Sequence, residues 1–122
     1  MKLFITGGLG FIGSNYILNK LNDSTTEILN YDKITYAGNP ENLLSLKNND
    51  KYNFIQGDIC NQELLLKTIT DFSPDIIINF AAESHVDRSI DSPLDFINTN
   101  IVGTSILLNA SLEYWNSLSD KS

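Results

Sequence analysis

The four glycines in residues 4–13 (FITGGLGFIG) have the spacing of a phosphate-binding turn. Gly7, Gly10 and Gly13 lie three residues apart, and Gly8 makes the same stretch fit the pattern G-x-G-x-x-G. Such a turn lets a dinucleotide pyrophosphate approach the backbone, and the helix that follows offers free N–H groups and a partial positive charge. The stretch follows a strand-like apolar segment and precedes a helical pattern, which is the context that this chemistry requires.

Two other kinds of glycine-rich turn could have this spacing. A phosphate-loop NTPase needs Gly-Lys-Ser or Gly-Lys-Thr, whereas Ser14 and Asn15 follow Gly13, so that class is excluded. A glycine-rich strand–helix turn without a ligand is the remaining alternative, and the strand–helix context counts against it.

Asp32 is placed to bind the adenosine ribose of such a dinucleotide. It ends the second strand-like segment, about 20 residues after the glycines, where a carboxylate accepts hydrogen bonds from the ribose hydroxyls. Its charge would repel the 2′-phosphate of NADP, so the sequence favours NAD, although the neighbouring Lys33 weakens this preference. The spacing disfavours the alternative, a solvated aspartate at the end of a strand.

Two further segments end predicted strands, on the edge where parallel sheets bind ligands. Asp58 could accept a hydrogen bond from the adenine amino group while Ile59 packs on the ring, and a helix-capping role for Asp58 is equally consistent with the spacing. Residues 79–82 (NFAA) end the next strand, and the small residues there would let the cofactor pass close to the chain.

The polar loop at residues 83–89 is a candidate substrate-side loop. His85, the single histidine, could act as a general base only if it reached a substrate proton, and a structural role is the alternative. Glu83, Asp87 and Arg88 could equally form a local cluster of ion pairs. Tyr36 is assigned to packing or loop structure rather than to acid catalysis.

Alternating strand and helix patterns are expected to position these residues. Apolar runs predict strands at 2–6, 27–32, 53–58 and 75–81, and helical spacing predicts helices at 11–21, after Pro40, at 61–72 with Asn61 as N-cap, and from 92 to about 115. This order predicts an α/β fold, a Rossmann-like parallel sheet with right-handed crossovers that is truncated after the fourth strand–helix unit. Residues 1–116 are expected to form the dinucleotide-binding domain and residues 117–122 a polar tail.

Two apolar segments are expected to be covered on more than one side. Ile76, Ile77 and Ile78 run without alternation, as in a central strand buried on both faces. In the helix after Pro93 the apolar residues spread around much of the circumference, which predicts more than one packed neighbour.

Composition excludes several classes of protein. The chain carries 8 Lys plus Arg against 15 Asp plus Glu, a formal net charge of −7, which argues against binding to nucleic acid or to an anionic membrane. One cysteine, Cys60, excludes an internal disulfide and a cysteine-rich metal site. Glycines or polar residues interrupt the uncharged stretches 3–19 and 96–112, so neither predicts a signal peptide or a membrane span. We expect a soluble, cytoplasmic protein without a metal site.

The motifs together resemble those of extended short-chain dehydrogenases/reductases that act on nucleotide sugars. ITGGLGFIG is similar to the TGxxGFIG cofactor loop of that family. Within the family, YDKITYAGNPENL, GDI, NFAAESHVDRSI and FINTNIVGT resemble the dTDP-glucose 4,6-dehydratases, and the similarity runs from Met1 to about Trp115. Related enzymes such as UDP-galactose 4-epimerase usually differ at YDKITYAGN and ESHVDRS.

The resemblance implies a site for NAD and an approach to the sugar. The glycine turn would hold the pyrophosphate, the ends of the second and third strands the adenosine, and the segment after the fourth strand the nicotinamide side. Ser84 and His85 would approach the hexose of dTDP-glucose. The implied cofactor-binding residues are Gly7, Gly10, Phe11, Ile12, Gly13, Asp32, Lys33, Ile34, Thr35, Asp58, Ile59, Phe80, Ala81, Ala82, Glu83, Ser84 and Thr99.

The family reaction, as the resemblance implies it, moves a hydride from C4 of the glucose unit to NAD, eliminates water across C5–C6 and returns the hydride to C6. The family's Tyr-x-x-x-Lys and Thr-Asp-Glu are expected further downstream, and Thr-Asp-Glu does not occur in these 122 residues. The one Tyr-x-x-x-Lys, from Tyr16 to Lys20, lies in the first predicted helix and is interpreted as a coincidence. We therefore expect no catalytic residue in this chain.

The resemblance covers roughly the first third of such an enzyme, so we expect a fragment that is inactive alone but could still bind NAD weakly, because the adenosine half of the site is present. A related nucleotide-sugar epimerase or decarboxylase is one alternative. A non-catalytic nucleotide-binding or assembly module is another. The uncovered apolar helix face and an open sheet edge predict a homodimer or a larger assembly.

Overall fold

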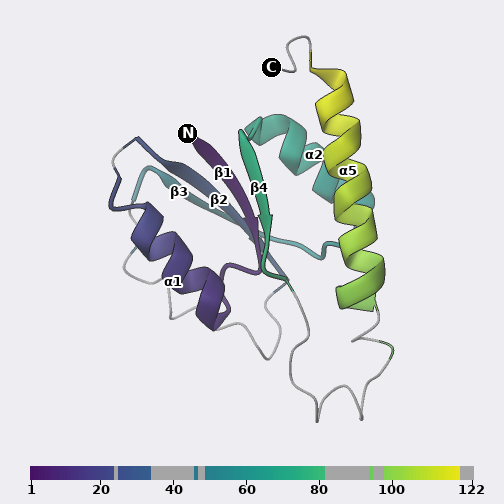
Figure 1. Cartoon of the computed structure of the whole chain (residues 1–122), viewed down its shortest axis with the longest axis horizontal. Coiled ribbons are helices and arrows are strands. Elements are labelled where there is room, and N and C mark those ends of the chain that lie inside the picture. The colour runs from purple at the N-terminus through teal and green to yellow at the C-terminus, as the bar shows by residue number, and fades with distance from the viewer. Residues whose placement is uncertain (24, 34–45, 47–48, 82–93, 95–97, 119–122) are drawn as a thin grey trace.

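The computed structural model describes the chain except for residues 24, 34–45, 47–48, 82–93, 95–97 and 119–122 (Figure 1). Its centre is a four-stranded parallel sheet in the order β3-β2-β1-β4. The strands are β1 (Lys2–Thr6), β2 (Glu27–Asp32), β3 (Tyr52–Gln56) and β4 (Ile76–Asn79). Because the strands are parallel, all four carboxyl ends lie at the same edge, which is where the predicted site residues follow them.

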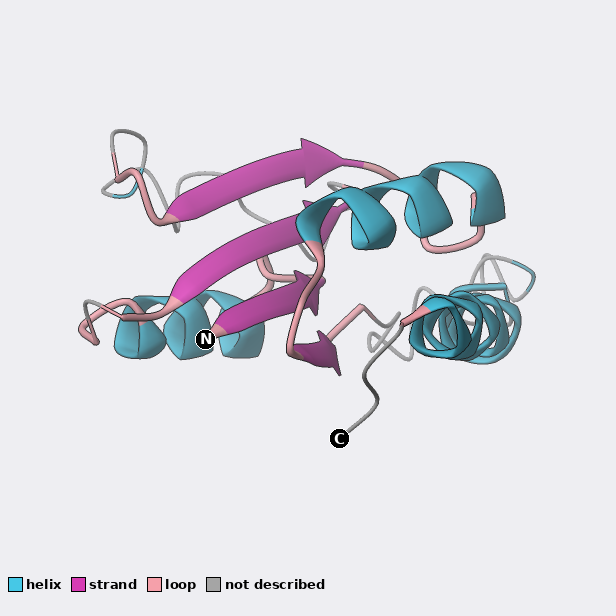
Figure 2. Cartoon of the chain, turned by 90° about the horizontal axis from the view of Figure 1, so that it is seen from above, coloured by secondary structure: helices cyan, strands magenta, loops and turns pink. Residues whose placement is uncertain are grey.

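Helices cover both faces of this sheet, as Figure 2 shows. Helix α1 (Phe11–Lys20) packs on one face, while α2 (Gln62–Phe72) and α5 (Thr104–Ser117) pack on the other and against each other. A π-helical segment, η2 (Asn98–Gly103), leads directly into α5. This arrangement confirms the predicted α/β, Rossmann-like fold.

Side-chain alternation along the strands divides the core into two clusters. On the α1 face, Leu3 and Ile5 of β1 pack with Ile17 of α1. On the opposite face, Phe4 of β1 packs with side chains of α2 and α5. The second cluster contains the buried residues Phe4, Leu29, Tyr31, Ile59, Leu65, Ile69, Phe72, Leu107, Ala110 and Tyr114.

Helix α2 shows how local sequence fixes the end of an element. The Asn61 side chain accepts a hydrogen bond from Leu64 N at 3.2 Å, which confirms this residue as the N-cap. At the other end Ser73 adopts a left-handed φ of 54°, and its N–H donates to Ile69 O at 2.9 Å.

Two predictions about the strands need correction. Strand β3 ends at Gln56 rather than at residue 58: Gly57 N makes a last hydrogen bond to Asp32 O of β2 at 3.0 Å, and a turn closed by Asn61 N and Asp58 O follows. Among the described residues β4 pairs with β1 alone, so it is an edge strand and not a central one, and Ile76 is 43% exposed. The predicted helix after Pro40 and the predicted helix start at Ser92 lie outside the described residues.

The expectation that α5 is covered on more than one side is also wrong within the described part of the chain. Leu107, Ala110 and Tyr114 are buried in the core cluster that α5 shares with α2 and the sheet. The opposite side leaves large apolar side chains exposed on η2 and α5, namely Ile101, Val102, Leu108, Leu112 and Trp115. No described helix combines the length and the apolar character needed to cross a membrane.

The packing predicts a clear contrast between two leucines in helices. Leu65 of α2 is fully buried, whereas Leu108 of α5 is 66% exposed. Leu65→Ala should lower the free energy of unfolding by about 2–5 kcal/mol, because it removes buried methyl groups and leaves a cavity. Leu108→Ala should change it by less than about 0.5 kcal/mol. Urea unfolding of both variants tests the assignment of the core, and equal losses would contradict it.

Candidate functional site

The glycine-rich turn lies at the point where the sheet topology reverses. Helix α1 after β1 packs on one face and α2 after β3 on the other, and β1 and β4 are neighbours, so their carboxyl ends flank the crevice where such sheets bind ligands. Gly7 follows β1 with a φ of +70°. A Cβ on Gly7 would lie 2.5 Å from the Ala81 nitrogen after β4, so no side chain fits between these two segments.

The start of α1 is packed equally closely against this turn. A Cβ on Gly13 would lie 2.5 Å from the carbonyl oxygen of Gly7. The turn is closed by hydrogen bonds from Gly10 N to Gly7 O at 3.2 Å and from Ser14 N to Gly10 O at 2.9 Å. These contacts give the glycines the roles that their spacing predicted, a tight turn and a close helix–strand approach.

Two polar side chains of β2 form hydrogen bonds with the backbone of the glycine-rich turn. The Asn30 Oδ1 atom accepts a hydrogen bond from Gly8 N at 2.9 Å, and the Asp32 Oδ2 atom accepts one from Leu9 N, also at 2.9 Å. Asp32 is only 7% exposed. The alternative of a solvated aspartate at the strand end is therefore wrong, and Asp32 belongs structurally to the glycine turn.

The N-terminus of α1 opens toward the same edge. As the first helical residues, Phe11, Ile12 and Gly13 have backbone N–H groups without acceptors inside the helix. The first turn of α1 carries no acidic residue, and the side chains of Phe11 and Ile12 are exposed. Ile12 therefore lies outside the core cluster against which Tyr16 packs. This end of the helix presents positive N–H dipoles suited to an anionic group.

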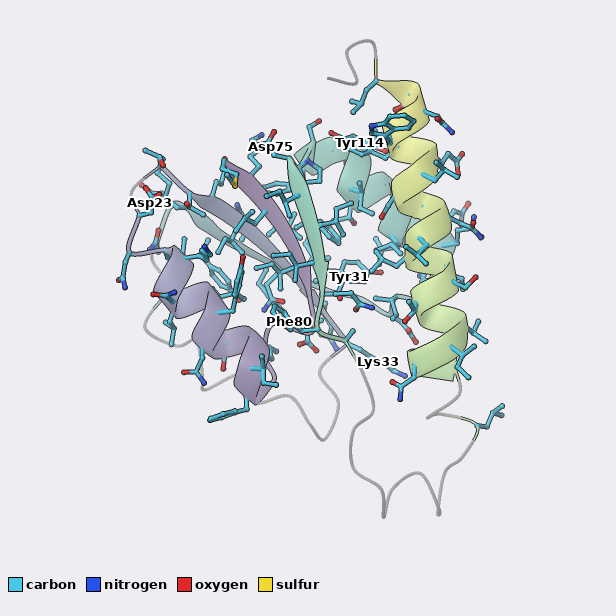
Figure 3. The ribbon with its side chains drawn as sticks, in the orientation of Figure 1. Asp23, Tyr31, Lys33, Asp75, Phe80 and Tyr114 are labelled. Atoms are coloured by element: carbon cyan, nitrogen blue, oxygen red, sulfur yellow. The ribbon has the colours of Figure 1, made fainter. Side chains whose placement is uncertain are left out.

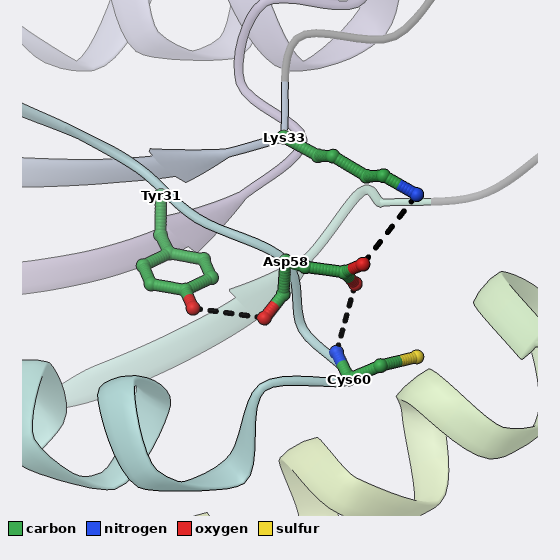
Figure 4. Close-up of polar contacts among 4 residues, drawn as sticks. All are labelled: Tyr31, Lys33, Asp58 and Cys60. Carbon is green, nitrogen blue, oxygen red and sulfur yellow. Dashed lines mark hydrogen bonds and ion pairs between the residues drawn. The ribbon is translucent and has the colours of Figure 1, made fainter.

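Asp58 is held at the end of β3 by contacts on three of its atoms (Figure 4). Its carboxylate accepts a hydrogen bond from Cys60 N at 2.9 Å through Oδ1, and its Oδ2 lies 3.4 Å from Lys33 Nζ. Its carbonyl oxygen accepts the Tyr31 hydroxyl at 2.8 Å. The cap of α2 is Asn61, so the helix-capping alternative for Asp58 is wrong.

The two residues that follow Asp58 are shielded from solvent to different degrees. Burial, with smaller contributions from the charge of Asp58 and a hydrogen bond to it, raises the pKa of the half-buried Cys60 thiol. Ile59 is buried in the core with α2 and α5, so it presents little side-chain surface at this edge.

Asn79, the last residue of β4, forms hydrogen bonds with residues of β1 and α5. Asn79 Oδ1 accepts hydrogen bonds from the Thr6 hydroxyl and, at 3.0 Å, from Ala81 N. Asn79 Nδ2 donates to Thr104 Oγ1 at 3.4 Å. These bonds fix the backbone of Phe80 and Ala81 beside Gly7.

The Tyr16 and Lys20 pair has a structural explanation. The Tyr16 ring packs on Phe80 with 5.5 Å between ring centroids, and Lys20 Nζ lies 5.5 Å from the centroid of the Tyr16 ring. Both side chains are engaged in this stack, which agrees with the interpretation of this Tyr-x-x-x-Lys as a coincidence.

Most of the described site residues lie at one edge of the sheet. Figure 3 shows Phe80 and Lys33 at this edge, whereas Asp23 and Asp75 lie at the opposite one. Thr99 lies in η2, ahead of α5. Ile34, Thr35, Ala82, Glu83, Ser84 and His85 lie outside the described residues. Within the described part of the chain, no group of three or more His, Cys, Asp or Glu residues could hold a metal ion.

Sequence reasoning missed two residues of β2 that support this edge. Asn30 supports the glycine turn and Tyr31 supports Asp58, from opposite faces of the strand. A signal for Asn30 was present in the sequence, because a polar amide two residues before Asp32 shares its strand face.

The strand order, the glycine turn and the carboxylate at the end of β2 define a Rossmann-type dinucleotide-binding fold. Residues 4–121 match the family model described as GDP-mannose 4,6 dehydratase, and the chain belongs to that family. It is 48% identical to a dTDP-glucose 4,6-dehydratase of Escherichia coli, over 98% of this chain and 33% of that protein. It is 47% identical to one of Xanthomonas campestris, over 95% of this chain and 33% of the relative. The predicted resemblance is thus confirmed.

Solved structures give the same result. The dTDP-glucose 4,6-dehydratase of Streptomyces venezuelae with NAD bound has a TM-score of 0.87 and 39% identity, covering 93% of this chain and 36% of its own. A UDP-glucose 4-epimerase of Thermotoga maritima has a TM-score of 0.80 and 30% identity, covering 93% and 35%. The chain spans about a third of the length of these relatives.

The Tyr31–Asp58 contact predicts an effect of pH on stability. Burial, and then the Asp58 charge, raises the pKa of the Tyr31 phenol from 10.0 to about 12. The folded state therefore holds this proton more tightly than the unfolded state, so its contribution to stability is complete below pH 10.0 and is lost as the pH rises toward about 12.

Tyr31→Phe has no phenolic proton to lose, so its free energy of unfolding should fall less steeply over this pH range. Urea unfolding at a series of pH values measures the slope. Thr68→Val, which removes a buried hydroxyl from α2 and no titratable group, should keep the wild-type slope. Identical slopes for the wild type and Tyr31→Phe would contradict the assignment.

Proposed function

We propose that this chain is the NAD-binding part of a dTDP-glucose 4,6-dehydratase. The observation that carries the proposal is the glycine turn at the reversal point of the sheet, fixed by Asp32 and packed without space for a side chain against the end of β4. The identity of 48% to a dehydratase of that name supports the choice of substrate, dTDP-glucose.

The residues at this edge fit NAD. The pyrophosphate would lie over Gly7 and the first N–H groups of α1, where the backbone offers donors and no Cβ intervenes. Asp32 would accept hydrogen bonds from the adenosine ribose, and Asp58, held by Lys33 and Cys60, would lie on the adenine side. Ser84 and His85 remain proposed contacts to the hexose.

For the complete protein we propose conversion of dTDP-glucose to dTDP-4-keto-6-deoxyglucose. C4 is oxidised, water is eliminated across C5–C6, and a hydride is returned to C6. NAD supplies the capacity to accept and return that hydride. The residues of this chain bind and orient the cofactor through the glycine turn and the ends of β2, β3 and β4.

Cofactor preference tests the proposal at Asp32. NAD should bind at least about tenfold more tightly than NADP, because a 2′-phosphate would lie beside the Asp32 carboxylate. Asp32→Asn keeps an acceptor for Leu9 N but removes the charge, so the preference should shrink. Asp71→Asn, on the exposed side of α2, is the matched control and should bind as the wild type does. Calorimetry that detects no NAD binding to the folded wild type would overturn the proposal.

Activity of the isolated chain provides a second test. These 122 residues contain no Thr-Asp-Glu, and Tyr16 and Lys20 are engaged in a packed stack, so the purified chain should form no 4-keto-6-deoxy sugar from dTDP-glucose. Chromatography of the sugar nucleotides measures this, and product formation would refute the expectation.

Two alternatives differ in what they predict for the whole gene product. An epimerase or decarboxylase would act on other sugar nucleotides, although the 30% identity to an epimerase is lower than the 39% to a dehydratase. A non-catalytic module would end with a stop codon after Ser122. A reading frame that continues into Thr-Asp-Glu and Tyr-x-x-x-Lys would favour the enzyme, and assays with several sugar nucleotides would then identify its substrate.

We also propose that the chain self-associates, as a homodimer or larger, and works in the cytoplasm. The support for association is the exposed apolar side of η2 and α5, which includes Ile101, Leu108 and Leu112, together with the edge strand β4. Light scattering at high concentration should show more than a monomer, and Leu112→Glu should lower the measured mass. A monodisperse wild-type monomer would contradict this.

A further inference from the structure

Asn30 occupies an interior position of β2 where an apolar side chain would be ordinary. It is fully buried, and both ends of its amide are used. The Oδ1 atom accepts Gly8 N at 2.9 Å, and Nδ2 donates to the Tyr52 hydroxyl of β3 at 3.1 Å. The side chain thus connects the glycine turn to the neighbouring strand across the α1 face of the sheet.

Burying an amide costs stability unless its hydrogen bonds are replaced. In this fold the replacement comes from the backbone N–H of Gly8 and from the Tyr52 hydroxyl. The Gly8 N–H can only donate, so it requires the Oδ1 end of the amide to face the turn, and the Tyr52 hydroxyl accepts a hydrogen bond from the Nδ2 end that faces away. The arrangement therefore favours one orientation of the Gly8 peptide.

That orientation determines which N–H groups remain for a ligand. The side chains of Asn30 and Asp32, on the same face of β2, accept hydrogen bonds from the N–H groups of Gly8 and Leu9. These two N–H groups therefore point toward β2 and away from a ligand. The N–H groups of Phe11, Ile12 and Gly13 are left at the open end of α1. Asn30 is neutral, so it holds the turn without adding a negative charge near a pyrophosphate.

We infer that Asn30 is a positioning residue, which acts through Gly8 to hold the glycine turn in the conformation that receives the cofactor pyrophosphate. The inference rests on the proposed NAD-binding function. Asn30 itself touches no ligand in this arrangement, in contrast to the role proposed for Asp32.

The test compares ligands with and without phosphates on the 122-residue chain. Asn30→Leu has a similar volume but no acceptor for Gly8 N. It should weaken binding of ADP-ribose at least about tenfold, as expected for the loss of one buried hydrogen bond, while binding of adenosine changes by less than about twofold. Tyr52→Phe retains the acceptor but frees the amide, and should weaken ADP-ribose binding by about threefold. Thr68→Val, a buried hydrogen-bond deletion in α2, should leave both ligands unaffected.

Hydrogen exchange gives a readout that needs no ligand. The Gly8 amide should exchange at least about tenfold faster in Asn30→Leu and measurably faster in Tyr52→Phe, while the Ile69 amide in α2 keeps its protection. Unchanged Gly8 exchange in both variants would overturn the inference, as would equal weakening of ADP-ribose and adenosine. If Asn30→Leu does not fold, Tyr52→Phe decides both measurements. Failure of the wild type to bind any ligand would instead overturn the proposed function, and Gly8 exchange would still decide the role of Asn30.

Discussion

The contact between Gly7 and the backbone at Ala81 is the constraint on which the candidate site depends. It brings the turn after β1 and the end of β4 together at the point where the sheet reverses direction. A side chain at position 7 would separate these segments, and the hydrogen bond from Phe80 N to Thr6 O at 2.8 Å depends on their proximity. The positive φ at position 7 and the lack of space for a Cβ there are two independent reasons why this position requires glycine.

Strand β2 supplies the supports for both halves of the edge. Its α1 face presents Asn30 and Asp32 to the glycine turn, and its other face presents Tyr31 to the turn at Asp58. Because side chains alternate along a strand, β2 supports both the turn proposed to bind the pyrophosphate and the turn proposed to bind the adenine. Since β2 is covered on both faces and paired on both edges, these polar groups lie in a buried and fully paired part of the sheet.

Local patterns were sufficient to predict the features whose causes are local. The glycine turn, the position of Asp32 at the end of β2 and the Asn61 cap each depend on a few consecutive residues or on one known separation. Asn30 was missed because its partners, Gly8 and Tyr52, are distant along the chain and meet only through the strand order. The edge position of β4 was missed because an apolar run such as Ile76–Ile78 reports the capacity for burial and not the presence of a neighbour. The choice between Asp58 and Asn61 as cap depended on where β3 ends, which the spacing did not determine.

The charge distribution explains how an acidic chain can offer a site for an anionic ligand. With a formal net charge of −7, the chain as a whole would repel a pyrophosphate. The two aspartates at this edge each have structural partners: Asp32 accepts Leu9 N, and Asp58 is held by Cys60 N and Lys33. The first turn of α1 carries no acidic side chain, so the N–H dipoles there are not neutralised locally. Asn30 and Asp32 accept the N–H groups of Gly8 and Leu9, and the N–H groups at the start of α1 can therefore attract the ligand at short range.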